Sequence, residues 1–389
     1  MKTMEVIAPC HFGLEAVLKR EIYDLGYEIT RVEDGRVTFL GDAEAICRGN
    51  IFLRTAERIL IQVGRFPARS FEELFSGIKA LPWEEYLPEN GKFWVTMSSS
   101  VKSKLYSIPD ILFSPSDIQS IMKKAMVERM KETYQREWFS EDGAAFPVRL
   151  FLMKDEVTVA LDTTGQPLHK RGYRTWTSKA PISETLAAAL LMLTPWRADR
   201  ILVDPFCGSG TFLIEAALMA SHIAPGKNRT FTAMEWTNLI PPSMWREVLE
   251  EAVEMEEEPE HMDLQGYDID PDMIKIAREN ARQAGVDHLI HFQVRDVADL
   301  RHNKKYGFLI TNPPYGERLE EKKNLPALYR TLGEAYRRLD SWSMYVITSY
   351  EDAEKDIGRK ADKTRKLYNG MIRTYFYQFM GPKPPKREK

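Results

Sequence analysis

The stretch Asp204-Pro205-Phe206-Cys207-Gly208-Ser209-Gly210 stands between an apolar run and a segment with apolar residues at helical spacing. The apolar run, Ile201 to Val203, predicts a buried strand, and residues 211–218 predict a helix that begins directly after the loop. The two glycines allow unusual backbone dihedrals and let a ligand approach the first N–H groups of the helix. Close packing of strand against helix would also explain the glycines, so the loop by itself leaves both interpretations open.

The residues around the glycines narrow the class of ligand. A phosphate-binding P-loop would place Gly-Lys-Ser/Thr at its end, but no lysine follows Gly210. A dinucleotide-binding loop would have a small residue at position 213, which is Leu213. Asp204 would repel phosphate and attract the ammonium group of an amino acid. The loop therefore predicts a site for the methionine end of S-adenosylmethionine.

Polar residues also follow the next predicted strands, which lie at 264–267, 290–294 and 306–311. Asp268 could accept hydrogen bonds from both ribose hydroxyls, and Asp296 could accept one from the amino group of adenine. The carboxyl ends of parallel strands line one crevice, so we expect Asp204, Asp268, Asp296 and Asn312 to lie at one edge of a sheet. Asp270 precedes a proline and suits a helix cap.

The motif Asn312-Pro313-Pro314-Tyr315 follows the fourth of these strands. Two prolines stiffen the backbone, so the Asn312 side-chain oxygen and the Pro313 carbonyl can hold two hydrogens of a planar amine. Accepting both hydrogens raises the electron density on the amine nitrogen and aligns it for attack on a methyl sulfonium. Tyr315 offers a surface on which an extruded base can stack. A loop that is only stiffened by its prolines is the alternative.

The first 165 residues alternate strand-like and helix-like segments, which predicts two small α+β units with a joint at 64–70. The first unit has expected strands at 4–8 and 37–40 and helices at 13–25 and 42–53. The second has an expected helix beginning at Ser70, a strand at 93–97, a helix at 116–134 and strands at 148–153 and 157–161. Basic residues that could meet an RNA backbone, or simply solvate the surface, are Lys102, Lys104, Lys123, Lys124, Arg129, Lys170, Arg171 and Arg174.

Two segments after this basic region organise the catalytic half. A helix through Leu193, with Ser183 as its cap, is apolar nearly all round and should be buried against the sheet. An insertion at about 222–262 is rich in proline and acid and separates the first strand–helix unit from the second.

The composition of the chain limits the class of protein to which it can belong. The 389 residues suffice for two or three domains, 43% of them are hydrophobic, and the net charge of −3 does not by itself indicate nucleic acid. No apolar run reaches the ~18 residues needed to span a bilayer, and residues 1–12 lack a signal-peptide layout, so we expect a cytoplasmic protein without a membrane partner. Cys10, Cys47 and Cys207 share no metal-type spacing, and no base is placed beside Cys207.

These motifs resemble the cofactor and catalytic motifs of class I S-adenosylmethionine-dependent amino-methyltransferases. More narrowly, the whole chain resembles the THUMP-domain RNA guanine-N2 methyltransferases, the family of bacterial large-subunit rRNA and archaeal tRNA enzymes. The resemblance extends to the segments Pro9-Cys10-His11-Phe12-Gly13-Leu14-Glu15, Leu53-Arg54-Thr55-Ala56-Glu57-Arg58 and Leu168-His169-Lys170-Arg171-Gly172-Tyr173-Arg174.

The resemblance implies three units. A ferredoxin-like piece at 1–64 and a THUMP domain at 65–165, which would grip RNA, precede a Rossmann-like α/β methyltransferase domain at 166–389. The family also includes proteins with a second methyltransferase domain, whereas this chain ends soon after one, so dual activity is not expected.

Residue by residue, the resemblance implies a catalytic role for Asn312, Pro313, Pro314 and Tyr315. The implied cofactor-binding residues are Asp204, Phe206, Cys207, Gly208, Ser209, Gly210, Thr211, Asp268, Ile269, Asp296, Val297 and Asn312, with Pro181, Glu184 and Thr185 closing over the methionine end.

The resemblance further implies methyl transfer to guanine N2 in structured RNA, with 23S rRNA preferred over tRNA as the partner, S-adenosylmethionine as the cofactor, and no metal. From the residues alone, adenine N6 and a glutamine amide remain alternatives, because the same loop suits all planar amines. An RNA-binding assembly factor with a vestigial cofactor site is the non-enzymatic alternative.

Overall fold

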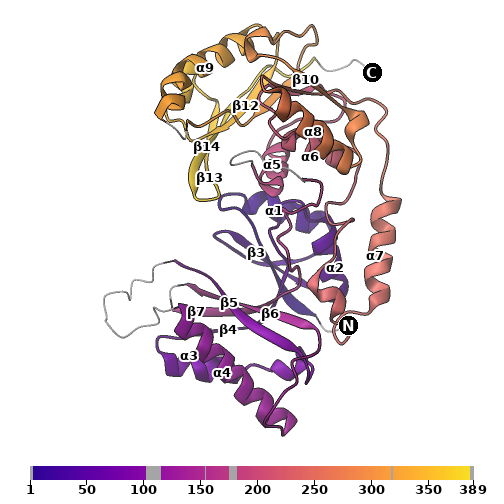
Figure 1. Ribbon diagram of the computed structural model, residues 1–389, viewed down its shortest axis with the longest axis vertical. Helices are drawn as coiled ribbons and strands as arrows, with labels where there is room; N and C mark the ends of the chain where they lie inside the picture. The colour runs from indigo at the N-terminus through magenta and orange to yellow at the C-terminus, as the bar shows by residue number, and fades with distance from the viewer. Residues whose placement is uncertain (1–2, 102–114, 154, 175–181, 317–318, 386–389) are drawn as a thin grey trace.

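The computed structural model describes residues 3–101, 115–153, 155–174, 182–316 and 319–385. Within these residues the strands form two seven-stranded sheets. The sheets are stacked along the long axis of the molecule, with the N-terminal sheet at one end and the C-terminal sheet at the other (Figure 1). The fold is therefore an α+β N-terminal half followed by an α/β half, as the sequence predicts.

The N-terminal sheet has the order β2-β3-β1-β4-β7-β6-β5. Its first half comprises β1 Met4–Pro9, α1 Glu15–Asp24, β2 Ile29–Glu33, β3 Arg36–Gly41 and α2 Ala43–Phe52. Its second half comprises β4 Leu60–Pro67, α3 Phe71–Lys79, β5 Lys92–Val101, α4 Pro115–Tyr134, β6 Ala145–Met153 and β7 Glu156–Asp162. The predicted elements are confirmed, and Ser70 caps α3 by accepting from the backbone N–H of Glu73 at 3.1 Å.

The expected break in regular structure at 64–70 is wrong for its first four residues, because β4 continues to Pro67. Strand β4 pairs with β1 on one side and β7 on the other, so the two N-terminal units share one sheet. Gly64 lies at a register shift, and Pro67 is the last residue of the strand; both are positions that strands tolerate. Strand β2, which the sequence analysis did not predict, pairs with β3 at the far edge.

The C-terminal sheet has the order β10-β9-β8-β11-β12-β14-β13. The pairs from β10 to β12 are parallel, and β14 is antiparallel to both of its neighbours. The strands are β8 Leu202–Asp204, β9 Leu264–Asp268, β10 Ile290–Val294, β11 Phe308–Thr311, β12 Ser343–Thr348, β13 Lys363–Asn369 and β14 Ile372–Phe379.

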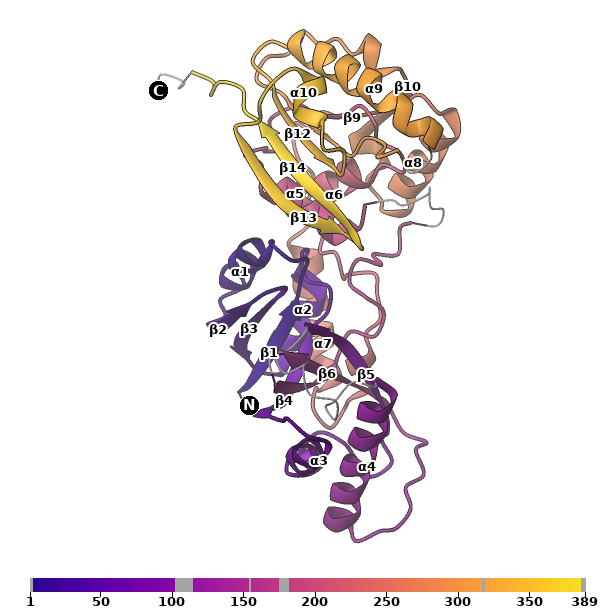
Figure 2. The same ribbon diagram turned by 90° about the vertical axis from the view of Figure 1, so that its left-hand side faces the viewer.

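Helices cover both faces of this sheet (Figures 1 and 2). They are α5 Glu184–Met192, α6 Thr211–Ala220, α8 Pro271–Gln283, α9 Leu319–Arg337 and α10 Ala353–Ile357. Helix α7 Pro242–Glu254 belongs to the insertion and packs on the N-terminal half. Short 3₁₀ turns lie at Trp83–Glu85 in the N-terminal half and at Thr232–Glu235, Asp287–Leu289 and Val297–Asp299. In β8, Leu202 packs in the core with α5, α6 and α8, whereas Val203 packs in the core with α9. Alternation along a strand with both faces buried explains the unbroken apolar run. The predicted burial of α5 is confirmed.

The insertion at 222–262 reaches back to the N-terminal sheet. Helix α7 packs against α2, and the two lie side by side in Figure 1. Trp236 is fully buried, donates its indole N–H to the Ala145 carbonyl at 2.8 Å and stacks on Phe146 at 4.7 Å between ring centroids. The insertion therefore joins the two halves through apolar contact. In the part of the chain that the structure describes, no helix has the length and apolar character needed to cross a membrane.

Candidate functional site

The loop after β8 crosses the tip of the neighbouring strand β9. Asp204 is the last residue of β8, and Asp268 is the last residue of β9. The N–H of Gly208 donates to Asp268 Oδ2 at 3.0 Å, and the N–H of Cys207 donates to the Tyr267 carbonyl at 2.9 Å. The two predicted acids are thus held at one edge of the sheet by the glycine loop itself.

Glycine is needed at the two positions of the loop for different structural reasons. Both have positive φ, +48° at Gly208 and +84° at Gly210. A Cβ on Gly210 would lie 2.9 Å from Phe292 Cζ and 3.2 Å from Ala277 Cβ, so this glycine permits close packing. A Cβ on Gly208 would meet no heavy atom within 4 Å. The face of Gly208 is therefore open, as a ligand running past the loop requires.

Asp204 is a buried carboxylate, with 2% of its surface exposed. Its Oδ1 accepts from Thr311 Oγ1 at 2.7 Å and from the N–H of Phe206 at 3.1 Å. Burial raises the pKa of Asp204 to about 7 although both hydrogen bonds favour the charged form, and repulsion from Asp268 acts in the same direction as burial. A cationic group placed here would offset the free-energy cost of burying the ionised carboxylate, so the site suits an ammonium group.

The neighbouring strand ends carry the residues predicted to hold the rest of the cofactor. Asp268 Oδ1 accepts from the N–H of Asp270 at 3.0 Å, and burial raises the pKa of Asp268. The side chain of Ile269 lies beside it and is 69% exposed, an apolar surface on which an aromatic ring can lie. Asp296 is exposed after β10 and caps the turn that contains the buried Val297.

The four polar residues that the sequence predicts to lie at one edge stand at the ends of four neighbouring strands, β10, β9, β8 and β11, or within two residues after them. That placement is confirmed, whereas the contact of each residue with a ligand stays a prediction. Asp270 caps α8 as predicted, accepting from the N–H of Asp272 at 2.8 Å.

The loop Asn312 to Tyr315 is held from two sides. The Tyr315 hydroxyl donates to Asn312 Oδ1 at 2.5 Å, which fixes the orientation of the Asn312 amide. From α9, the Tyr329 hydroxyl lies 3.5 Å from the Pro314 carbonyl and 2.6 Å from Thr348 Oγ1. Burial raises the pKa of the Tyr315 hydroxyl, which therefore stays protonated as the donor.

Sequence reasoning missed several residues that support the site. Thr311 could have been found because it directly precedes the Asn-Pro-Pro-Tyr motif and ends a predicted strand. Asn280 donates to the Ser209 carbonyl at 3.0 Å, and Arg174 donates to Thr211 Oγ1 at 2.7 Å. These two and Tyr329 are far from their partners in sequence, so no local pattern indicates them.

The start of α5 is held by side chains from the N-terminal half. Ser183 caps the helix and lies 3.1 Å from His11 Nε2, while Thr185 donates its hydroxyl to Glu57. Glu57 also hydrogen-bonds His169 Nδ1 at 2.8 Å. Burial alone would raise the pKa of Glu57, but the hydrogen bonds from His11 and His169 hold it well below its usual range.

The three segments that carried the wider resemblance therefore meet at one junction, through His11, Glu57 and His169. Glu184 is buried and lies 3.4 Å from Arg174, so both Glu184 and Thr185 have structural partners at this point. Pro181, the remaining residue predicted here, lies outside the described residues. A contact of Glu184 or Thr185 with cofactor stays a prediction.

Arg171 is buried, so its predicted contact with RNA is wrong. Its guanidinium donates to the carbonyls of Leu168 at 2.8 Å and Arg54 at 2.6 Å, and it pairs with the fully buried Glu215 at 3.5 Å. Only 2% of its side chain is exposed. A basic cluster in sequence does not distinguish a cation that faces solvent from one that a buried carboxylate neutralises.

The guanidinium of Arg174 is used within the protein as well, and its contact with RNA stays a prediction. It donates to the Ile182 carbonyl and to Thr211, pairs with Glu184, and leaves 11% of the side chain exposed.

The other predicted RNA contacts remain accessible where the structure describes them. Lys123, Lys124 and Lys170 are exposed, while Arg129 pairs with Glu84. Lys102 and Lys104 lie outside the described residues.

The cysteines do not form a reactive or metal-binding centre among the described residues. All three are buried and free. Burial raises the pKa of Cys207 well above its usual range, and the nearby acids Asp204 and Asp268 act in the same direction. The thiolate is strongly disfavoured, which fits the interpretation of Cys207 as a small loop residue.

Comparison with known proteins follows the same division of the chain. Residues 171–378 match the family model described as "RMKL-like, methyltransferase domain". Residues 5–60 match the RlmL ferredoxin-like domain, and residues 68–162 match the THUMP domain.

Two curated relatives are similar over most of this chain. "Putative RNA methyltransferase YpsC" of Bacillus subtilis is 47% identical, and the match covers 100% of this chain and 99% of that protein. "Ribosomal RNA large subunit methyltransferase K/L" of Syntrophotalea carbinolica is 34% identical over 94% of this chain. The chain spans about half of that second relative, 52% of its length.

A solved structure agrees with the fold. The structure titled "SMU.472, a putative methyltransferase complexed with SAH" is 43% identical and superposes with a TM-score of 0.91, over 99% of this chain and 100% of that one. On the family model, the curated relatives and the architecture, the chain belongs to the RMKL-like methyltransferase family, with ferredoxin-like and THUMP units preceding a class I methyltransferase domain.

Proposed function

We propose that this protein is an S-adenosylmethionine-dependent RNA methyltransferase that modifies the exocyclic N2 of a guanine, with 23S rRNA as the first candidate substrate. The observation that carries the proposal is the 2.7 Å hydrogen bond from Thr311 to Asp204. It joins the acid suited to the methionine ammonium to the residue that directly precedes Asn312. The THUMP unit and the K/L relatives support RNA, and ribosomal RNA in particular, as the substrate.

The residues of the chain fit the proposed cofactor. Asp204 offers a buried carboxylate to an ammonium, and the open face of Gly208 leaves room for the methionine tail. Asp268 is placed to accept from the ribose hydroxyls, while the exposed Ile269 and Asp296 suit the ring and the amino group of adenine. When bound, this cofactor supplies a methyl group on a positively charged sulfur. These assignments are proposals for each residue.

The catalytic loop is suited to activate a planar amine. Asn312 Oδ1 already accepts from Tyr315, but an amide oxygen has two lone pairs and can accept a second hydrogen. The Pro313 carbonyl would accept the other hydrogen of the amine. Held in this way, the amine nitrogen would direct its lone pair at the methyl group that the cofactor supplies, and it would release one proton to solvent after the transfer. Cys207 takes no part, because its thiol stays protonated.

Substitution of Asn312 tests the catalytic assignment. We expect Asn312→Ala to keep cofactor binding and to lower kcat by about 10²–10³, the usual cost of one group that stabilises a transition state. Asp268→Ala should instead weaken cofactor binding. Single-turnover rates and isothermal titration separate the two effects, and normal turnover by Asn312→Ala would refute the role of Asn312.

The substrate is identified by methylation of RNA from a strain that lacks the gene. Ribosomal and transfer RNA are incubated separately with the protein and cofactor, and the nucleosides are analysed by mass spectrometry. New N2-methylguanosine in the 23S fraction supports the proposal, and its appearance in tRNA changes the substrate only. N6-methyladenosine would overturn the choice of base. No RNA methylation by a protein that binds cofactor would favour a protein amide substrate or an assembly factor.

A further inference from the structure

The hairpin of β13 and β14 belongs to the catalytic domain and presents exposed cations on both faces of its edge strand. Strand β13 is at the edge of the sheet, and Figure 2 shows the hairpin running toward the N-terminal half. Lys363, Arg365 and Lys366 are exposed on it. Within the described residues, no carboxylate lies within ion-pair distance of these three side chains. Their positive charge is therefore open to a partner.

The tip of the hairpin lies at the same edge of the sheet as the catalytic loop, because β13 and β12 are both antiparallel to β14 and so run in the same direction. Asn369, the last residue of β13, acts to lower the pKa of the Tyr315 hydroxyl against the larger effect of burial, and that hydroxyl donates to Asn312. A group bound at the tip would therefore lie close to the residue proposed to hold the target amine.

The same tip contacts the N-terminal half. The rings of Tyr368 and Phe12 meet edge to face at 6.2 Å between centroids. A Cβ on Gly13 would lie 3.3 Å from Leu367 Cδ2, so backbone and hairpin are in close contact. The hairpin thus connects the catalytic loop to the half of the molecule that carries the THUMP unit.

Large apolar side chains at this tip are exposed. Met371 is 97% exposed and Phe12 is 47% exposed. Lys366 Nζ lies 5.9 Å from the centroid of the Tyr368 ring. Proteins bind unpaired nucleic acid by combining two kinds of side chain: cations that contact the phosphates, and flat or apolar side chains on which the bases stack.

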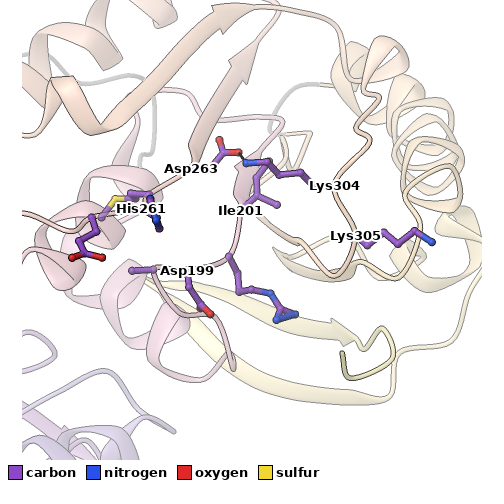
Figure 3. Close-up of a pocket in the computed structure, with 10 residues that line it drawn as sticks. Asp199, Ile201, His261, Asp263, Lys304 and Lys305 are labelled. Atoms are coloured by element: carbon purple, nitrogen blue, oxygen red, sulfur yellow. Dashed lines mark hydrogen bonds and ion pairs between the residues drawn. The ribbon is translucent and has the colours of Figure 1, made fainter. Parts of the chain in front are cut away.

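The amino ends of the central strands β8, β9 and β11 form another edge of the sheet, and the charge there is arranged differently. A hollow of about 600 Å³ there contains Arg200, Lys304 and Lys305 (Figure 3). Lys304 pairs with Asp263, and Lys305 pairs with Asp340 at 2.8 Å. Because carboxylates neutralise these lysines, this edge does not favour a polyanion.

We propose that the β13–β14 hairpin binds the RNA strand that flanks the target nucleotide, through Lys363, Arg365 and Lys366 along β13 and through Phe12, Tyr368 and Met371 at its tip. The proposal rests on the proposed function and deepens it. A guanine can reach Asn312 only when it is unstacked, and the neighbouring nucleotides must then be held in place. The cations of β13 would hold their phosphates, and the exposed rings would stack on their bases.

The test compares two triple variants that remove the same charge. Lys363, Arg365 and Lys366 are replaced by alanine in one, and Arg200, Lys304 and Lys305 in the other. Binding of deproteinised 23S rRNA from the strain lacking the gene is measured over a range of salt concentrations. Each lost phosphate contact reduces the slope of log K against log salt by about 0.7, so the hairpin variant should lose about 2 from the slope. The control should keep the slope of the unmodified protein, and an unchanged slope in the hairpin variant would overturn the proposal.

A second pair of variants tests stacking. Phe12→Ala should weaken RNA binding about fivefold, the lower end of the loss expected for one stacked base. Tyr23→Ala removes another exposed aromatic, on α1 outside the THUMP unit, and should have no such effect. Equal RNA affinity of Phe12→Ala and the unmodified protein would contradict the stacking part of the proposal. Cofactor affinity and Tm should be unchanged in all four variants.

Because RNA binding is measured without methyl transfer, the two proposals can fail separately. Suppose that the salt slope of RNA binding depends on the hairpin cations but the protein methylates no RNA. The hairpin would then still be an RNA-binding surface, and the proposed function would be rejected. Suppose instead that the hairpin variant binds bare RNA as well as the unmodified protein does but no longer methylates ribosomal particles. The hairpin would then contact a protein partner, and the hairpin proposal would be rejected.

Discussion

At the scale of single residues, Asp204 combines two demands that oppose each other. It is buried beside Thr311, and burial raises its pKa from the usual 3.8 to about 7. Because the folded protein binds this proton more tightly than the unfolded chain, Asp204 lowers stability as the pH rises from about 4 through 7. An ammonium group requires the same carboxylate in its ionised form. The residue therefore lowers the stability of the fold but favours binding of a cationic ligand.

The first prediction concerns proton release at Asp204. A cationic ligand favours the ionised carboxylate, so cofactor binding near pH 7 should release a proton, and affinity should fall as the pH is lowered below 7. Titration calorimetry in two buffers of different ionisation enthalpy measures the protons released. Asp204→Asn should abolish this release, weaken binding and raise the Tm of the cofactor-free protein. Equal proton release by the variant would assign the effect to another group.

The second prediction contrasts the two glycines of the loop. Gly208→Ala adds a methyl group in open space, so it should cost about 1–2 kcal/mol for a left-handed backbone and should block the cofactor. Gly210→Ala adds the same strain and also forces the methyl group against Phe292 and Ala277, so its loss of stability should be larger. Urea denaturation measures both, and equal losses would contradict the packing role of Gly210.

At the scale of elements, helix α6 is joined to the N-terminal half by a buried ion pair. Glu215 of α6 receives the Tyr173 hydroxyl at 3.0 Å and pairs with Arg171, which also donates to the Arg54 carbonyl. This network crosses between helix α6 and the segment after α2. Its charged groups have no access to water, so removal of one partner leaves the other unpaired.

The third prediction uses two adjacent residues of one motif. Arg171→Ala should lower the free energy of unfolding by about 3–5 kcal/mol, because it leaves Glu215 buried without its cation. Lys170→Ala removes the same charge from an exposed position and should change the free energy by less than about 0.5 kcal/mol. Urea denaturation of both variants decides the matter; similar stability of the two would mean that Glu215 does not need Arg171.

At the scale of the whole molecule, the insertion at 222–262 determines how the two sheets are connected. Trp236 is buried against Phe146, and α7 packs on α2. This packing connects the N-terminal sheet to the catalytic domain, so we expect it to contribute to the stability of both.

The fourth prediction separates the two halves. Trp236→Ala should cost about 3–5 kcal/mol, the usual loss for a large buried aromatic. It should also divide thermal unfolding into two transitions in calorimetry, one for each sheet, where the unmodified protein shows one. Trp138→Ala, which removes an exposed indole, serves as the control. A single transition in Trp236→Ala would show that other contacts suffice to join the halves.

The sequence by itself determined the elements around the site and the order of their functional residues. Apolar runs and helical spacing are local patterns, so the strand before Asp204, the caps Ser183 and Asp270, and the edge that holds Asn312 could all be predicted. These features depend on residues a few positions apart, and the carboxyl ends of parallel strands meet wherever such units repeat.

Only the tertiary structure decided the rest. It showed β4 continuing through the expected joint, Arg171 buried against Glu215, and the insertion packed on the N-terminal sheet. It also placed the hairpin tip against Phe12 and Gly13 of the N-terminal half. Each of these features depends on a partner that is far away in the chain. Whether a side chain is buried, or its charge neutralised, is decided by that partner. Local spacing carries no record of it, so the same basic motif holds both an exposed Lys170 and a buried Arg171.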